Sequence, residues 1–154
     1  MAGSAAEYVA SHFLLVLATA GADGTPHAAP MFYAPDGLRI YLSAPADSRT
    51  AKNLEANPRA SVALADMPTQ LTDAESVQLE GAVTAIEGDD AARAADLFAE
   101  RYPFLGDAVR QARFFRLDPA EVTYVHNDRP GDVHFEALGQ EWERESVPVD
   151  EQGG

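Results

Sequence analysis

Hydrophobic and polar residues alternate in short runs along most of the chain, and a period of two is typical of β-strands. The pattern predicts strands over residues 13–19, 27–33, 38–43, 59–65 and 76–87, and over the shorter segments 114–117 and 121–126. The first of these runs is apolar throughout, so we expect it to be buried. Asp-Gly pairs at 23–24 and 36–37 are typical of tight turns and join the first three strands as a meander. Asp118-Pro119 predicts a further turn, between the last two segments. Gly81, within the pattern of residues 76–87, marks either a bulge or a strongly bent strand.

Helical spacing is confined to a few segments. Residues 47–57 begin with the cap candidates Asp47 and Ser48 and end before Pro58, which cannot continue a helix. Residues 89–101 carry apolar side chains at helical spacing and close before Pro103. Residues 4–12 are compatible with a short helix, and 106–111 with one helical turn.

Many short strands separated by Asp-Gly turns predict a mainly β protein. We expect a barrel of six to seven antiparallel strands with flanking helices, rather than a parallel α/β sheet. The chain shows no internal repeat and no linker between two domains. We therefore predict one domain over residues 1–138, followed by an acidic, loosely attached tail over 139–154.

Charge and composition narrow the function. Eleven basic against 25 acidic residues give a net charge of −14, which repels nucleic acids and anionic membrane surfaces. We take this charge as a device for solubility rather than for recruiting a basic partner. No apolar run reaches the roughly 20 residues needed to cross a bilayer, no secretion signal is recognisable, and there is no cysteine. These features predict a soluble, cytoplasmic protein.

Familiar catalytic and metal-binding motifs are absent. The sequence contains no dinucleotide-binding glycine motif, Walker loop, nucleophile elbow or zinc-protease motif. None of the histidines pairs with another at helical spacing; they are His12, His27, His126 and His134. We therefore expect no metal site.

The most promising candidate site is the start of the helix predicted over 47–57. Ser48, Arg49 and Thr50 offer unpaired backbone N–H groups, two hydroxyls and a guanidinium within one turn, which suits an anion such as a phosphate. Ser43, at the end of the preceding strand, could add another hydroxyl. The alternative is that Ser48 only caps the helix and Arg49 is solvated.

A series of segments in order and spacing resembles the FMN-binding split barrels of the pyridoxamine 5'-phosphate oxidase-like family. The resemblance covers about residues 10–126, and each motif is weak alone while the series is fairly specific. Its segments are 13–19, 23–33, 40–43, Ser48-Arg49-Thr50-Ala51-Lys52-Asn53-Leu54 with Asn57-Pro58-Arg59, 77–82, 98–103 and 115–122.

This resemblance implies a homodimer with FMN in the groove between the subunits. It implies that the phosphate lies at the start of the helix and the end of the preceding strand, and that backbone groups near residues 29–32 flank the flavin ring. A contact from the fifth strand is also implied. The implied cofactor-binding residues are Ala29, Pro30, Met31, Phe32, Ser43, Ser48, Arg49, Thr50, Lys52, Ser76 and Gln78.

The sequence departs from the family pattern at several places. Thr50 stands where many members have a phosphate-binding lysine, and Ala29 where the true oxidases have an arginine. Lys52 would compensate if the helix began later than the pattern indicates. Residues 127–132 replace the substrate-binding arginine and histidine segment of the true oxidases, so we do not expect oxidation of pyridoxamine phosphate.

Two classes of function follow from the resemblance. The first is an FMN-dependent oxidoreductase with an unknown small-molecule substrate, in which the flavin supplies the redox chemistry. Tyr33, Tyr41 and His27 are then the nearest candidates for contacting substrate or ring, although such residues more often serve barrel packing alone. The second is a non-catalytic protein that binds or stores a flavin, a deazaflavin or haem, with a haem-degrading enzyme as a further alternative on the same scaffold.

Overall fold

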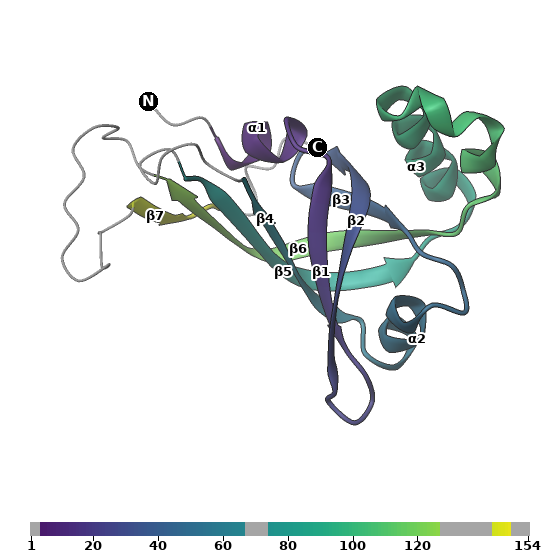
Figure 1. The fold of residues 1–154 in the computed structure, drawn as a ribbon, viewed down its shortest axis with the longest axis horizontal. Coiled ribbons are helices and arrows are strands. Elements are labelled where there is room, and N and C mark those ends of the chain that lie inside the picture. Colours follow the sequence, from purple (N-terminus) through teal and green to yellow (C-terminus); the bar gives the residue numbers. More distant parts are fainter. Residues whose placement is uncertain (1–3, 67–73, 127–142, 149–154) are drawn as a thin grey trace.

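The computed structural model describes residues 4–66, 74–126 and 143–148. Within these residues the chain forms seven strands and four helical segments (Figure 1). The strands are β1 (Leu14–Ala20), β2 (Pro26–Asp36), β3 (Arg39–Ser43), β4 (Arg59–Ala65), β5 (Ser76–Ala85), β6 (Phe114–His126) and β7 (Glu143–Ser146). The helices are α1 (Ala5–Ala10), α2 (Arg49–Ala56), α3 (Gly88–Arg101) and the 3-10 segment η2 (Pro103–Gln111).

The first six strands close into an antiparallel barrel. The sheet runs β3-β2-β1-β4-β5-β6-β7, and a further pairing of β3 with β6 closes the barrel and leaves β7 outside it. Every pairing is antiparallel, so the predicted mainly β barrel with flanking helices is confirmed. Within the segment predicted as a tail, β7 pairs with residues 123–126 of β6.

The core fills the barrel with the inward-facing side chains of alternating residues. On β1, Leu15 and Leu17 are each 1% exposed, whereas Leu14 and Val16 are 56% and 39% exposed. The expectation that residues 13–19 form a buried strand is therefore wrong for half of its side chains. A barrel of this size has one interior, so the outward half of an all-apolar strand remains on the surface.

The prediction of a turn at Asp118-Pro119 is also wrong, because β6 continues through both residues. The pairing of β5 with β6 shifts between Glu80 and Gly81, so that Ala120 is the extra residue of a bulge. A proline lacks the N–H of a regular ladder, and a bulge is one of the few places where a strand accepts it. Gly81 allows close approach, since a Cβ there would lie 2.2 Å from the carbonyl oxygen of Asp118.

A second apolar cluster lies outside the barrel, where α3 and η2 cover part of β2, β3 and β6. It is built around Phe98, Tyr102 and Phe114, and Figure 1 shows α3 at this end, away from α1 and β7. η2 contains two short turns joined at Gly106, whose φ of 59° favours glycine. Among the residues of η2, Val109 is buried, so this segment packs lightly on the body of the protein.

No helix among the residues that the structure describes is long and apolar enough to cross a membrane.

Candidate cofactor site

The start of α2 is held by the capping that its sequence predicts. The Ser48 Oγ accepts the N–H of Ala51 at 3.1 Å and donates to the carbonyl oxygen of Pro45 at 2.6 Å. The helix begins at Arg49, and its first regular bond runs from the Lys52 N–H to the Ser48 carbonyl. The N–H groups of Arg49 and Thr50 precede that bond and have no partner within the helix.

Side chains at this helix start differ in exposure. Thr50 is 5% exposed and packs under the helix, while Arg49 and Lys52 are exposed. Because the helix does not begin later, Lys52 lies on its first turn rather than at its N-cap. Asn53 donates from Nδ2 to the Thr19 Oγ1 at 3.0 Å, and this buried bond fixes α2 against β1.

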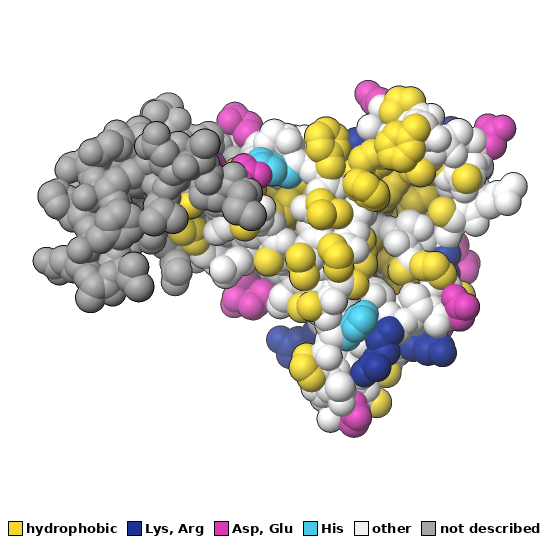
Figure 2. Space-filling model, viewed as in Figure 1, with side chains coloured by type: hydrophobic (Ala, Val, Ile, Leu, Met, Phe, Trp, Pro, Cys, Tyr) yellow, Lys and Arg dark blue, Asp and Glu magenta, His cyan; other side chains and the backbone are white. Residues whose placement is uncertain are grey.

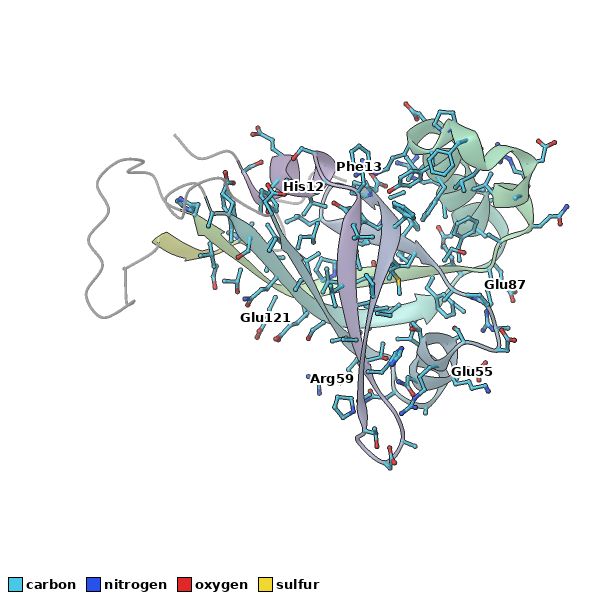
Figure 3. The ribbon with its side chains drawn as sticks, in the orientation of Figure 1. His12, Phe13, Glu55, Arg59, Glu87 and Glu121 are labelled. Atoms are coloured by element: carbon cyan, nitrogen blue, oxygen red, sulfur yellow. The ribbon has the colours of Figure 1, made fainter. Side chains whose placement is uncertain are left out.

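Three cations gather at this corner without carboxylate partners. Arg49, Lys52 and Arg59 form no ion pair with another described residue. Figure 2 shows basic side chains gathered around α2 and the lower end of the barrel, and Figure 3 labels Arg59 there. Other arginines do pair with carboxylates; they are Arg39, Arg93, Arg110, Arg113 and Arg116. Arg49, Lys52 and Arg59 therefore have no described carboxylate that neutralises them directly, while Asp23 lies within electrostatic range of Arg49.

The turn between β1 and β2 borders the same corner. The N–H of Thr25 bonds to Asp23 Oδ1 at 3.0 Å, and this bond is the main reason that the pKa of Asp23 lies below its ordinary value. The charge of Arg49 contributes to the same lowering to a smaller extent. Arg49 therefore acts electrostatically across the gap between α2 and this turn.

One edge of β2 lies open beside the corner. Residues 26–32 pair with β1, but β3 pairs with 33–36 alone, and no other described strand covers the rest. Tyr33 turns its N–H and carbonyl toward Tyr102, on the side of β1 where Phe13 lies. Since these groups alternate in direction along a strand, the carbonyl of Pro30 and both the N–H and the carbonyl of Phe32 turn toward the open edge.

The four predicted ring-flanking residues lie on both faces of β2. Ala29 and Met31 stand opposite Leu17 and Leu15 of β1 and so share the core-facing side. Pro30 and Phe32 lie on the outer face, with Phe32 54% exposed. The strand thus presents backbone groups at its edge and apolar side chains on its outside.

Met31, Phe32 and Ser43 also line a cavity of about 380 Å³. Apolar side chains of α3, η2 and the start of β6 close it from the other side. These are Phe98, Leu105, Ala108, Val109, Ala112 and Phe114. The structure therefore brings three predicted cofactor residues to one hollow. The residues that face them carry no local signal of a binding site in the sequence.

Ser76 and Gln78 lie elsewhere on the outer surface. Gln78 pairs with Ala63 on β4, which pairs with Val16 on β1, which pairs with Pro30 on β2. Three strand spacings separate Gln78 from β2, which amounts to roughly 14 Å. Within one chain, these two residues do not join the others.

The tyrosines considered for substrate contact are packing residues in this structure. Tyr33 and Tyr41 are buried, and the Tyr33 hydroxyl donates to the Val9 carbonyl at 2.5 Å. Burial raises the pKa of Tyr33 above its ordinary value, so the phenol stays neutral. His27 is half-buried on β2, opposite Thr19.

A second hollow, of about 530 Å³, lies on the outer face of β1, β4, β5 and β6. Its floor is made mostly of alanine and glycine, with Arg59, Glu80 and Glu121 among its lining residues. Sequence reasoning missed it because it depends on the pairing of four strands. Among the described residues, no group of three or more histidine, aspartate or glutamate side chains is placed to hold a metal ion.

The fold resembles several solved structures. A haem-binding protein from Mycobacterium smegmatis superposes with a TM-score of 0.77 at 22% identity, over 99% of this chain and 61% of that one. A conserved hypothetical protein from Mycobacterium tuberculosis gives 0.73 at 26% identity, over 90% and 94%. An FAD-binding protein from Mesorhizobium loti gives 0.61 at 21% identity, over 77% and 87%.

This chain thus spans about three fifths of the length of the Mycobacterium smegmatis protein. No curated protein sequence matches it. The family model for pyridoxamine 5'-phosphate oxidase matches residues 1–126. The chain therefore belongs to the pyridoxamine 5'-phosphate oxidase-like family of split barrels.

Proposed function

We propose that this protein binds FMN between two copies of the chain and acts as a flavin-dependent oxidoreductase on a small molecule. The observation that carries the proposal is the group of unpaired cations, Arg49, Lys52 and Arg59, beside the open edge of β2. A phosphate needs positive charge and N–H donors, and a flavin ring needs an apolar surface with a few backbone groups. Both are present at one end of the barrel.

The phosphate end fits the residues at the start of α2. The N–H groups of Arg49 and Thr50 and the guanidinium of Arg49 are the donors available there, and Lys52 and Arg59 add charge. The Ser48 hydroxyl contributes as the cap that orders this turn, because its proton is already donated to Pro45. The positive charge that a lysine at position 50 would supply comes instead from neighbouring positions.

The ring end fits β2. Pro30 and Phe32 supply an outward apolar surface, and the N–H of Phe32 turns toward the open edge. When bound, the flavin supplies hydride or electron transfer. The chain's own contribution is to bind and orient it, and we assign no acid or base role to any described side chain.

A second copy of the chain completes the proposed site. Large exposed apolar side chains gather over β1, β2 and η2, and Figure 2 shows them on one face. They are Phe13, Leu14, Val16, Phe32, Phe104 and Leu105. Apolar patches of this kind mark interaction surfaces. Ser76 and Gln78, too far away within one chain, would contact the cofactor from the partner.

The test compares FMN with riboflavin, which lacks the phosphate. Isothermal titration of the purified protein should show FMN binding more tightly than riboflavin. Arg49→Ala should weaken FMN binding about tenfold and leave riboflavin unchanged, because a charged hydrogen bond contributes about 1.5–3 kcal/mol. Arg93→Ala is the matched control, since Arg93 pairs with Asp36 on another part of the surface.

Turnover is tested on the same sample. Reduction of bound FMN by NADH or NADPH, followed by reoxidation by oxygen or a dye, would support the enzyme. Bound FMN that is never reduced would favour a carrier. If neither FMN nor a deazaflavin binds, the flavin proposal fails.

Haem is the second candidate ligand, because the Mycobacterium smegmatis protein of the same fold is described as haem-binding. Haem propionates would use the same cations. A Soret band on adding haem, with bilin formed under a reductant, would favour this function over the first.

A further inference from the structure

The cavity under η2 shares Phe32 with the ring end of the flavin proposal, but its walls on α3, η2 and β6 are not used there. Its walls come from five elements, with Phe32 of β2 and Ser43 of β3 on one side and Phe98 of α3 and Leu105 of η2 on the other. A volume of about 380 Å³ lies within the range of small-molecule sites, about 300–1,000 Å³. It is continuous with β2, where we placed the ring end of the flavin.

None of the described residues that line the cavity carries a charge, and Ser43 is the one that offers a polar side chain. On α3 and η2, Asp96 and Arg110 pair with each other, with Arg110 Nη1 2.7 Å from Asp96 Oδ1. A charged ligand entering here would lose its hydration without gaining a partner, and this costs several kcal/mol. The lining therefore selects against ions of either sign.

Three phenylalanines, Phe32, Phe98 and Phe114, are among the lining residues. The ring centroids of Phe98 and Phe114 lie 5.2 Å apart, and those of Phe32 and Tyr102 lie 5.5 Å apart. Phe104, which precedes the lining residue Leu105, is 76% exposed and meets Tyr102 edge to face. Rings with exposed faces favour stacking of another flat aromatic molecule.

We propose that this cavity binds a flat, uncharged, mostly apolar aromatic molecule, with Ser43 bonding a single polar group on it. The statement that this molecule is the substrate rests on the proposed function. Its binding step does not depend on bound flavin, so the two can fail separately. Leu105 and Ala108 on η2 set the width of the site.

The test uses three probes of one shape and different charge: 2-naphthol, 2-naphthoate and 2-naphthylmethylammonium. Each is titrated calorimetrically into the flavin-free protein near neutral pH. We expect 2-naphthol to bind about a hundredfold more tightly than either ion, as the cost of stripping a charge implies. Equal binding of the three probes would overturn the proposal.

Two variants, each with an alanine replaced by phenylalanine, locate the site. Ala108→Phe places a ring in the cavity and should weaken 2-naphthol binding about tenfold. Ala92→Phe, at an exposed position of α3 that does not line the cavity, should leave the affinity unchanged. Thermal melts of both variants confirm folding. Unchanged affinity in Ala108→Phe would place 2-naphthol elsewhere and overturn the proposal.

Two further outcomes keep the claims distinct. If 2-naphthol binds as expected but no flavin does, the cavity stands and the proposed function falls. If 2-naphthol does not bind and Ala108→Phe disrupts the dimer, a second copy fills the cavity and the inference is overturned, while FMN binding can still be measured.

Discussion

The hydroxyl of Tyr102 lies 2.5 Å from the carbonyl oxygen of Tyr33 and 3.3 Å from its backbone nitrogen. It therefore occupies the place of the next strand residue and satisfies both backbone groups where the pairing of β1 with β2 ends. The Nε of Arg101 donates to the hydroxyl oxygen of Tyr102 at 3.1 Å. One side chain at the end of α3 thus completes the sheet next to the open edge of β2.

Removing that hydroxyl should destabilise the protein. Tyr102→Phe leaves the buried N–H and carbonyl of Tyr33 without this partner, which costs about 1–3 kcal/mol. Urea unfolding followed by circular dichroism gives the value. Tyr33→Phe is the control, because it removes one hydrogen bond, from the Tyr33 hydroxyl to the Val9 carbonyl. A smaller loss in Tyr102→Phe than in Tyr33→Phe would contradict this account.

The buried phenol of Tyr8 predicts a loss of stability at alkaline pH. Burial, with smaller contributions from Asp66 and Glu75, raises the pKa of Tyr8 to about 12 from its ordinary value of 10.0. Between these pH values the folded protein keeps a proton that the unfolded chain has released. The contribution is therefore complete below about pH 10 and is lost as the pH rises toward about 12.

Tyr8→Phe isolates this contribution. At about pH 9 the variant should be less stable by about 1 kcal/mol, because the hydrogen bond from the Tyr8 hydroxyl to the Glu75 carbonyl is lost. The difference in stability between the two proteins should narrow by about pH 11, because only the wild type loses stability as the pH rises toward the pKa of Tyr8. Urea midpoints at both pH values measure it, and a constant gap would refute the raised pKa.

The exposed apolar face predicts self-association. Val16→Glu puts a charge at the centre of the outer face of β1, so the proposed dimer should dissociate and FMN affinity should fall with it. Sedimentation equilibrium measures the mass. Ala92→Glu, on the exposed surface of α3, adds the same charge and should leave the dimer intact. A wild-type protein that sediments as a monomer rules the dimer out.

Replacing Gly81 should destabilise the protein by a steric clash, and this loss can be compared with the loss from backbone strain at another glycine. Gly81→Ala would place a Cβ 2.2 Å from the Asp118 carbonyl oxygen, and forcing these strands apart should cost roughly 1–3 kcal/mol or more. Gly24→Ala is the comparison, since its φ of 84° is unfavourable but no atom lies near. It should cost about 1 kcal/mol. Similar losses in the two variants would show that the bulge relaxes freely.

The local elements could be predicted because their signals are local. Asp-Gly turns and alternation place β3 and β4 within a residue of their expected bounds, and Ser48 marks the start of α2 by its capping chemistry. Gly81, a glycine inside a strand pattern, marks a bulge as one of two alternatives, and the shift in the pairing of β5 with β6 confirms the bulge. The closure of β3 on β6 depends on partners far along the chain, and no period in the sequence reports such a pairing.

The residues of the candidate site also differ in whether a local stretch of sequence reveals them. Residues at the start of α2 could be proposed from one stretch of sequence, but its spacing did not reveal that Thr50 faces inward. The cavity joins Met31 to Phe114 across five elements. The turn expected over 106–111 lies within η2, but the role of Tyr102 carries no signal of its own, because an aromatic residue after a helix is ordinarily interpreted as packing.

The prolines of β2 have a consequence for the chain before it meets a partner or ligand. Pro26 and Pro30 fall in the part of the strand that no described strand covers on one side. A proline offers no hydrogen to an incoming strand, so a misfolded or newly made chain gains little by adding itself there. The gap in the barrel wall can thus stay accessible to a small molecule without inviting aggregation.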